Sequence, residues 1–294
     1  MEQIVLKTKS LNKRFGKKMA IEDFTIELEA GKIYGLLGRN GAGKTTLLKM
    51  ISGLILPTDG DIEVFGSNPF ENTAVLEKVC IVLETQLWEP TEKLANILKI
   101  CSEVYPKWDQ EYAELLLKKF NLDKSKKIKQ LSRGMVSAAF IIVGLAAKTP
   151  LTIFDEPTLG LDAAVRETFY NELINEAQEG ERTFILSTHL IEEVHRLFEE
   201  VIIIDTGKLR TYQPLEKLRQ SGYYVSGKED DVKAAVEGLN VIEMQRLGSL
   251  AVCTVIGDKK DAIGKPGIEI EPISLQKLFV HMTEHNKEEN SNEL

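Results

Sequence analysis

The stretch from Gly38 to Thr46 constrains this chain more than any other part of its sequence. It reads Gly-Arg-Asn-Gly-Ala-Gly-Lys-Thr-Thr, with the strand-like run 32–37 before it and the apolar-spaced run 47–51 after it. A strand, a glycine loop and a helix with the spacing G-x-x-x-x-G-K-T predict a phosphate-binding loop. Glycine permits backbone angles and close approaches that a side chain forbids, so successive N–H groups turn inward as an anion nest at a helix N-terminus. The stretch therefore predicts a nucleoside triphosphate site.

Two side chains of this loop have predicted roles of their own. Lys44 is expected to reach the terminal phosphates, and the Thr45 hydroxyl is expected to bind Mg²⁺. The other candidates for nucleotide binding in the loop are Gly38, Arg39, Asn40, Gly41, Ala42, Gly43 and Thr46.

A second strand supplies the carboxylates that such a loop needs. The apolar run Leu151–Asp155 ends in an aspartate and is followed by Glu156. In proteins with this loop a strand aspartate holds the metal, and an adjacent glutamate is placed to orient or deprotonate an attacking water. An Asp-Glu pair alone would be an ordinary strand-to-loop cap. Its place on a buried strand of a chain with a phosphate loop favours the metal and catalytic roles.

Alternating strand and helix patterns predict a mainly parallel α/β core. Expected strands are 4–8, 24–28, 32–37, 61–65, 79–83, 151–155, 183–186 and 201–205. Residues 88 to about 150 are expected to form a helical insertion, with helices at 92–105, 109–120 and 132–147, and a further helix covers 163–178. The segment 11–16 reads as an exposed turn carrying Phe15.

The phosphate-binding patterns stop near residue 220. We expect one nucleotide-binding domain at 1–220, with its helical subdomain at about 88–150, and a small α+β appendage at 221–294 with a frayed polar tail. Strands of the appendage are expected at 223–226, 241–246, 251–256 and 268–271, and helices at 231–237 and 274–283.

Composition narrows the class of protein. The formal net charge of −8 gives no support for a global basic surface that binds nucleic acid. No apolar run approaches the roughly 18–20 residues that cross a bilayer, and no signal-peptide pattern opens the chain, so a membrane role is expected to come through a partner. Cys80, Cys101 and Cys253 fit buried thiols in a reduced cytoplasm rather than a disulfide framework or a zinc site.

The segment Leu131-Ser132-Arg133-Gly134-Met135, just before a long helix, resembles the LSGGQ signature of the ATP-binding subunits of ABC transporters. The resemblance covers about residues 3–215. Ser132 and Gly134 match positions that contact the γ-phosphate in that family. The sequence departs from the signature at Arg133 and Met135. These departures bear on the strength of the contact with the γ-phosphate and on the rate of hydrolysis.

Other segments follow in the family's order. Leu159-Gly160-Leu161-Asp162 resembles the D-loop, which implies that Asp162 lies near a facing subunit. His189 resembles the switch histidine that contacts the γ-phosphate. Phe15 resembles the aromatic residue that stacks on adenine, for which a phenyl face suffices, although a core phenylalanine would look the same in sequence.

The glutamine loop of the family follows the strand at 79–83, where both Glu84 and Gln86 are available. Gln86 has the side chain that is chemically preferred for sensing the γ-phosphate and the metal. Glu84 has the closer offset from Lys44 and from the strand, so both stay candidates. Trp88 is either a partner contact or a core residue.

The resemblance implies an ATPase that uses Mg²⁺ and dimerises head to tail, as a homodimer or a heterodimer, around ATP. It also implies a separate transmembrane permease, a place on the inner face of the cell membrane and no nucleic-acid partner. Within the family, Tyr105-Pro106-x-Trp108-Asp109 is similar to exporters of the drug-resistance type, which implies a drug, an antimicrobial peptide or an amphiphile as cargo. The alternative is a soluble ABC-type ATPase acting on ribosomes or DNA. Such proteins carry two cassettes or long coiled-coil insertions, and the sequence shows neither.

Overall fold

The computed structural model describes residues 3–83, 88–189, 191–258 and 267–284. Contacts between residues divide the chain into two compact units. The first comprises Met1–Leu190 and Arg196–Tyr212, and the second comprises Ile191–His195 and Gln213–Leu294. The domain boundary expected at residue 220 stays a prediction.

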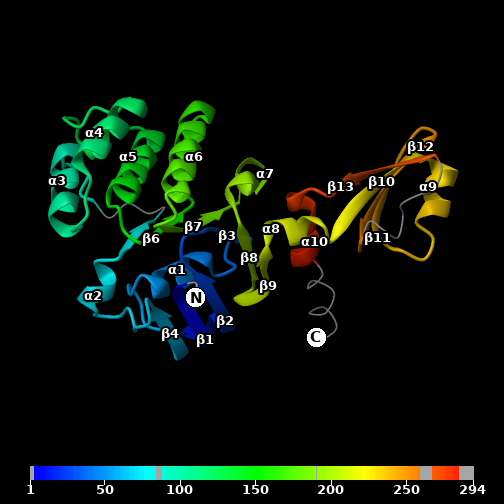
Figure 1. The fold of residues 1–294 in the computed structure, drawn as a ribbon, viewed down its shortest axis with the longest axis horizontal. Coiled ribbons are helices and arrows are strands. Elements are labelled where there is room, and N and C mark those ends of the chain that lie inside the picture. The colour runs from blue at the N-terminus through cyan, green and yellow to red at the C-terminus, as the bar shows by residue number, and fades with distance from the viewer. Residues whose placement is uncertain (1–2, 84–87, 190, 259–266, 285–294) are drawn as a thin grey trace. The chain divides into compact units, whose positions relative to one another are not determined.

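A parallel sheet forms the centre of the first unit (Figure 1). Its strands, in spatial order, are β5 (Val79–Val82), β6 (Leu151–Asp155), β7 (Thr183–Thr188), β3 (Ile33–Leu37), β8 (Glu200–Asp205) and β9 (Lys208–Pro214). The pairs β5–β6, β6–β7, β7–β3 and β3–β8 are parallel. Every residue of β3, β6 and β7 is buried, as expected for strands covered on both faces. The predicted parallel α/β core is confirmed.

An antiparallel sheet completes the nucleotide-binding part of this unit. It consists of β2 (Lys18–Glu29), β1 (Ile4–Phe15) and β4 (Asp59–Val64), with β1 in the middle. Helix α1 (Lys44–Ile51) contacts β2 and β4 of this sheet and β6 of the parallel sheet. One apolar cluster, which includes Phe24, Leu36, Leu48 and Ile153, therefore holds both sheets and the helix that follows the phosphate loop.

Helices fill the region between β5 and β7. They are α3 (Leu94–Val104), α4 (Gln110–Lys119), the short η1 (Ile128–Gln130), α5 (Arg133–Ala146) and α6 (Ala163–Gln178), whereas the short α2 (Thr73–Leu76) precedes β5. Helix α5 contacts α3, α4 and α6 as well as β5 and β6, so it joins the helical insertion to the sheet. The insertion predicted from residue 88 onward is present (Figure 1).

Two sequence expectations for this unit differ from the structure. The segment 11–16 is not a turn, because β1 continues through Phe15 and pairs with Lys18 on β2. The polar run Asn12-Lys13-Arg14 hides the strand pattern, and pairing with β2 supplies the hydrogen bonds that local propensity does not indicate. Strand β9 was not predicted, since its residues are mostly half-buried and lack an apolar run.

The second unit is a four-stranded antiparallel sheet with helices. In spatial order the strands are β11 (Asn240–Leu247), β12 (Leu250–Ile256), β10 (Gly222–Lys228) and β13 (Ile268–Pro272). Helix α9 (Glu229–Ala235) packs on this sheet through Val232, which joins the cluster around Tyr223 and Cys253. The remaining elements are α7 (Ile191–Val194), η2 (His195–Leu197), α8 (Leu215–Arg219) and α10 (Leu275–Glu284).

Helix α7 belongs to this unit through its contact with α10. A carboxylate oxygen of Glu192 accepts a hydrogen bond of 3.0 Å from the backbone N–H of Gln276, in the first turn of α10. Ile191 is 1% exposed. Within the described ranges, no helix combines the length and the apolar character that crossing a bilayer requires.

Candidate nucleotide-binding site

The loop between β3 and α1 has the backbone that its glycines predict. Gly41 and Gly43 have φ angles of +81° and +111°, in the region that favours glycine. A Cβ atom on Gly43 would lie 2.5 Å from the carbonyl oxygen of Ala20, and one on Gly38 would lie 2.7 Å from that of Ile204. The loop therefore holds its shape through backbone contacts with β2 and β8 that no side chain would permit.

This loop forms most of the wall of a pocket of about 420 Å³. The pocket also contains residues far from the loop in sequence. Its lining consists of Arg39 to Thr46, together with Phe15, Lys18, Ala20, Asp155 and Glu156. The structure thus brings together the predicted phosphate loop, the predicted base-stacking residue and both predicted carboxylates.

Lys44 is held inside the site and points back along the loop. Its side chain is 8% exposed, and its Nζ donates a hydrogen bond of 2.8 Å to the carbonyl oxygen of Gly38. The same Nζ lies 3.5 Å from Oε1 of Glu156. The ammonium group therefore has one carboxylate neighbour in the pocket, and a phosphate in the loop would compete with that carboxylate for the positive charge.

Asp155 lies at the carboxyl end of β6 and uses both of its oxygens. Thr45 Oγ1 donates to Asp155 Oδ2 at 2.6 Å, and Ser187 Oγ donates to Asp155 Oδ1 at 2.5 Å. Hydroxyl and carboxylate oxygens are the ligands that Mg²⁺ prefers, so Thr45 and Asp155 fit this metal. The sequence analysis assigned no role to Ser187. The parallel register that places Ser187 opposite Asp155 on the next strand explains its contact.

Glu156 follows β6 in a left-handed backbone conformation, with φ of +50°. Its N–H donates to the carbonyl oxygen of Ser187 at 3.1 Å. His189 contacts Oε2 of Glu156 through Nδ1 at 2.7 Å and through its backbone N–H at 3.3 Å. A left-handed conformation is costly for a residue other than glycine, and these contacts hold Glu156 in it. The side chain is 12% exposed, at the edge of the nucleotide pocket.

Phe15 lies at the end of β1 and is 51% exposed. The alternative of a core phenylalanine is therefore excluded. Lys13 Nζ lies 5.0 Å from the centre of its ring and donates a 2.6 Å hydrogen bond to the carbonyl oxygen of Leu56. The ring is thus available to a base at the rim of the pocket. Trp88 is half-buried, and Glu84 and Gln86 lie outside the described residues.

The predicted signature and D-loop residues do not join this pocket. Ser132, Gly134 and Asp162 are absent from its lining among the described residues. Ser132 Oγ accepts a hydrogen bond of 3.2 Å from Met135 N–H, and Asp162 Oδ1 accepts one of 2.9 Å from Val165 N–H. Within one chain these side chains act as helix N-caps.

Comparison with known proteins decides the family. A family model described as "ABC transporter" matches residues 21–159. An uncharacterized ABC transporter ATP-binding protein of Methanocaldococcus jannaschii is 33% identical over 75% of this chain and 81% of its own length. The chain belongs to the ABC transporter ATP-binding proteins.

Relatives and solved structures agree with this assignment. The ABC transporter ATP-binding protein YtrB of Bacillus subtilis is 26% identical over 95% of this chain and 96% of its own length. The bacitracin transport ATP-binding protein BcrA of Bacillus licheniformis is 32% identical over 74% of this chain and 72% of its own length. A structure of an ATP-binding subunit of an ABC transporter superimposes with a TM-score of 0.67 at 26% identity, covering 73% of this chain and 92% of that one.

The family defines the general activity of the chain. It is an ATP-binding subunit of an ABC transporter, with the fold of an ATP-binding cassette, and it is an ATPase coupled to transport. This result confirms the sequence-based assignment of the family, the fold and the enzyme class. The alternative of a soluble ATPase acting on ribosomes or DNA is not supported by these relatives.

Proposed function

We propose that this chain hydrolyses ATP as one half of a head-to-tail dimer and drives a separate transmembrane permease that exports a drug, an antimicrobial peptide or an amphiphile. The observation that carries the dimer is the incomplete pocket. It contains the phosphate loop and the carboxylates, while Ser132, Gly134 and Asp162 are not part of its lining. A chain with one loop and one signature completes its site with a second copy or with a related subunit.

The proposed roles of the residues follow from their positions. The loop N–H groups and Lys44 hold the ATP phosphates, and Phe15 stacks on the adenine. Thr45 and Asp155 hold Mg²⁺, which would offset charge on the phosphates when bound. Glu156 takes a proton from the attacking water or orients it, and His189 fixes the carboxylate of Glu156 through the 2.7 Å contact.

The signature is proposed to act on the nucleotide of the other subunit. Gly134 lies in the first turn of α5, directly after Ser132 and Arg133. A helix N-terminus presents N–H groups to an anion, and the hydroxyl of Ser132 adds a donor. ATP would bridge the two subunits, whereas ADP and released phosphate would not, so hydrolysis changes the preferred separation of the subunits. The region from Glu84 to Trp88, together with the helical insertion, is proposed to carry this change to the permease.

The cargo class is supported by the names of relatives. One relative is named for bacitracin transport. The Nod factor export ATP-binding protein I of Cupriavidus metallidurans is 29% identical over 69% of this chain and 69% of its own length. These names favour export. We propose that the chain lies on the inner face of the membrane beside the permease.

The test uses the full chain with Glu156→Gln. We expect this variant to bind ATP, to hydrolyse it about 10²–10⁴-fold more slowly, and to accumulate as an ATP-dependent dimer in sedimentation. Glu167→Gln, on an exposed face of α6, is the matched control and should behave as wild type. Lys44→Ala should lose tight ATP binding and dimerisation together. Unchanged turnover in Glu156→Gln would contradict the role given to Glu156.

Purification from membranes tests the partner. A hydrophobic subunit that co-purifies with the tagged chain supports the permease, whereas ribosomes or DNA in its place would overturn it.

A further inference from the structure

The first turn of α5 and the loop after β6 lie against each other backbone to backbone. A Cβ atom on Gly134 would lie 2.4 Å from the carbonyl oxygen of Gly160. Gly160 itself has a φ of +81°, in the region that favours glycine. No side chain separates the signature segment from the D-loop at this point, so a shift of one backbone toward the other is blocked.

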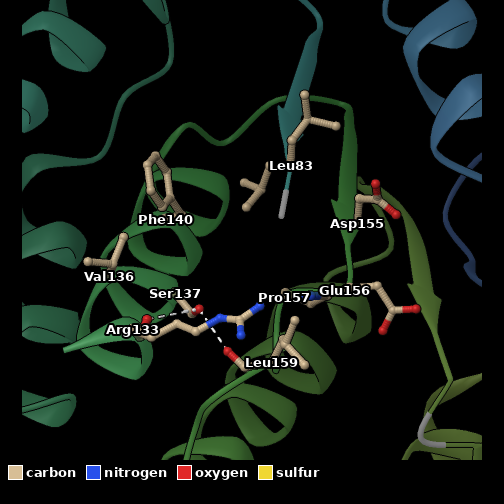
Figure 2. Close-up of a pocket in the computed structure, with 10 residues that line it drawn as sticks. Leu83, Arg133, Val136, Ser137, Phe140, Asp155, Glu156, Pro157 and Leu159 are labelled. Carbon is tan, nitrogen blue, oxygen red and sulfur yellow. Dashed lines mark hydrogen bonds between the residues drawn. The ribbon is translucent and has the colours of Figure 1, made fainter. Parts of the chain in front are cut away.

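A hydroxyl group adds a direct bond between the same two segments. Ser137 Oγ lies 3.0 Å from the carbonyl oxygen of Leu159 and 3.2 Å from that of Arg133, one helical turn earlier. Figure 2 shows both interactions, with the Ser137 side chain between the helix and the loop. A helical serine commonly bonds back to the carbonyl four residues before it. Here the shorter distance is to another segment.

The bond at Leu159 continues to the backbone of Glu156. Leu159 N–H donates to the carbonyl oxygen of Glu156 at 3.3 Å. A chain of two hydrogen bonds thus runs from the side chain of Ser137 through Leu159 to the backbone of Glu156. The left-handed conformation of Glu156 makes its position dependent on such neighbours.

The surroundings of Ser137 leave little room for adjustment. A small cavity of about 40 Å³ lies beside it, with Val82, Phe140 and Pro157 among its walls. Figure 2 shows Phe140 on α5 and Pro157 in the loop after β6, and Val82 is the last residue of β5. A cavity of this size holds about one water molecule. Alanine at position 137 would leave the carbonyl of Leu159 without its side-chain donor, while threonine would keep the hydroxyl and place a methyl group beside the cavity.

We infer that Ser137 is a positioning residue that holds the signature segment and the Glu156 loop in one fixed arrangement. The inference rests on the proposed function, in which Glu156 acts on the chain's own ATP and Ser132 and Gly134 act on the ATP of the other subunit. The hydroxyl of Ser137 then links Glu156, which acts on the chain's own ATP, to the signature segment, which acts on the ATP of the other subunit. Ser137 is not among the described residues that line the nucleotide pocket.

The experiment compares Ser137→Ala, Ser137→Thr and a control in the full-length protein. The control is Ser102→Ala on α3, whose hydroxyl bonds at 2.7 Å to Lys99 O within its own helix. For each variant we would measure the thermal midpoint, the affinity of a fluorescent ATP analogue, and kcat and KM for ATP. Loss of one hydrogen bond predicts a roughly 2- to 10-fold lower kcat for Ser137→Ala.

A positioning role also predicts what does not change. The affinity and the thermal midpoint of Ser137→Ala should match those of Ser102→Ala, and Ser137→Thr should recover kcat. A wild-type kcat in Ser137→Ala would overturn the inference, and so would losses of affinity and kcat in parallel.

The Glu156→Gln variant, measured beside these, distinguishes a failure of the proposed function from a failure of the role of Ser137. If Glu156→Gln fails to slow hydrolysis or to dimerise with ATP, the proposed function is wrong. If it behaves as expected while Ser137→Ala has normal turnover, only the role of Ser137 is wrong.

Discussion

Nδ1 of His189 lies 2.7 Å from Oε2 of Glu156, while the other oxygen of this carboxylate lies 3.5 Å from Nζ of Lys44. The carboxylate of Glu156 therefore links His189, which follows β7, to Lys44, which begins α1. Glu156 is held by Lys44, which the proposed mechanism assigns to the ATP phosphates, and by His189, which the family resemblance places at the γ-phosphate. Both contacts would have to adjust when that phosphate is present.

Removal of the histidine should affect turnover more than binding. His189→Ala deletes a contact to a charged group, and such a contact contributes about 1.5–3 kcal/mol, so kcat should fall roughly 10- to 100-fold. ATP affinity should change little because the phosphate loop is intact. Steady-state hydrolysis and equilibrium binding would measure the two quantities. His281→Ala, in α10 of the other unit, is the control, and an equal loss in that variant would point to a general effect.

The metal assignment predicts a shift in Mg²⁺ dependence. Asp155→Asn keeps the shape of the side chain but removes the charge that would attract the cation. Hydrolysis at saturating ATP should need at least about tenfold more Mg²⁺ for half-maximal rate, since one charge-assisted contact is worth roughly 1.5–3 kcal/mol. Asp61→Asn, an exposed residue of β4, should leave this dependence unchanged. The same Mg²⁺ titration curve for Asp155→Asn and wild type would contradict the assignment.

Phe15 should determine the preference for a base. Stacking of a base on an aromatic ring is worth about 1–3 kcal/mol, so Phe15→Ala should weaken ATP binding roughly 5- to 100-fold. Inorganic tripolyphosphate has no base, and its affinity should not change. Phe15→Tyr retains a ring and should bind ATP as wild type does. Equal weakening of ATP and tripolyphosphate would mean that Phe15 supports the loop rather than the base.

The buried thiol of Cys80 predicts a loss of stability at alkaline pH. Burial raises the pKa of Cys80 from 9.0 to about 11. Between these values the unfolded chain loses this proton and the folded chain keeps it, so the free energy of unfolding falls as pH rises. The stabilisation is complete below pH 9.0 and is lost as the pH approaches about 11. Its slope is at most on the order of 1 kcal/mol per pH unit.

Urea unfolding at several pH values would test this effect. The pH slope of Cys80→Ala should be shallower than that of wild type over this window, whereas other titrating groups contribute equally to both proteins. Identical slopes would exclude a contribution from Cys80.

The parts of the site that could be predicted from the sequence are those whose conformation is determined by neighbouring residues. Gly41 and Gly43 need their backbone angles because of the loop itself, and the apolar run of β6 ends at Asp155 because a parallel sheet places polar ends at one edge. These features are encoded in neighbouring residues. The order of strand, loop and helix was therefore predictable, and so was the parallel sheet.

Features that depend on distant segments were not predictable from the sequence. The contact of Ser187 with Asp155 depends on the register of β6 and β7, and the extension of β1 to Phe15 depends on pairing with β2. The bond between Ser137 and Leu159 joins a helix to a loop that the sequence separates by a strand. No local pattern indicates any of these contacts.

The short helix α7 has a consequence for how this protein can be divided. Ile191–His195 belong to the second unit, although most of the chain before and directly after them belongs to the first. A gene truncated after Tyr212 would therefore not encode a self-sufficient cassette. It would leave α7 without its contact with α10, and α7 begins two residues after His189. Loss, exchange or transplantation of the C-terminal unit during evolution would thus require compensating changes inside the ATPase sequence itself.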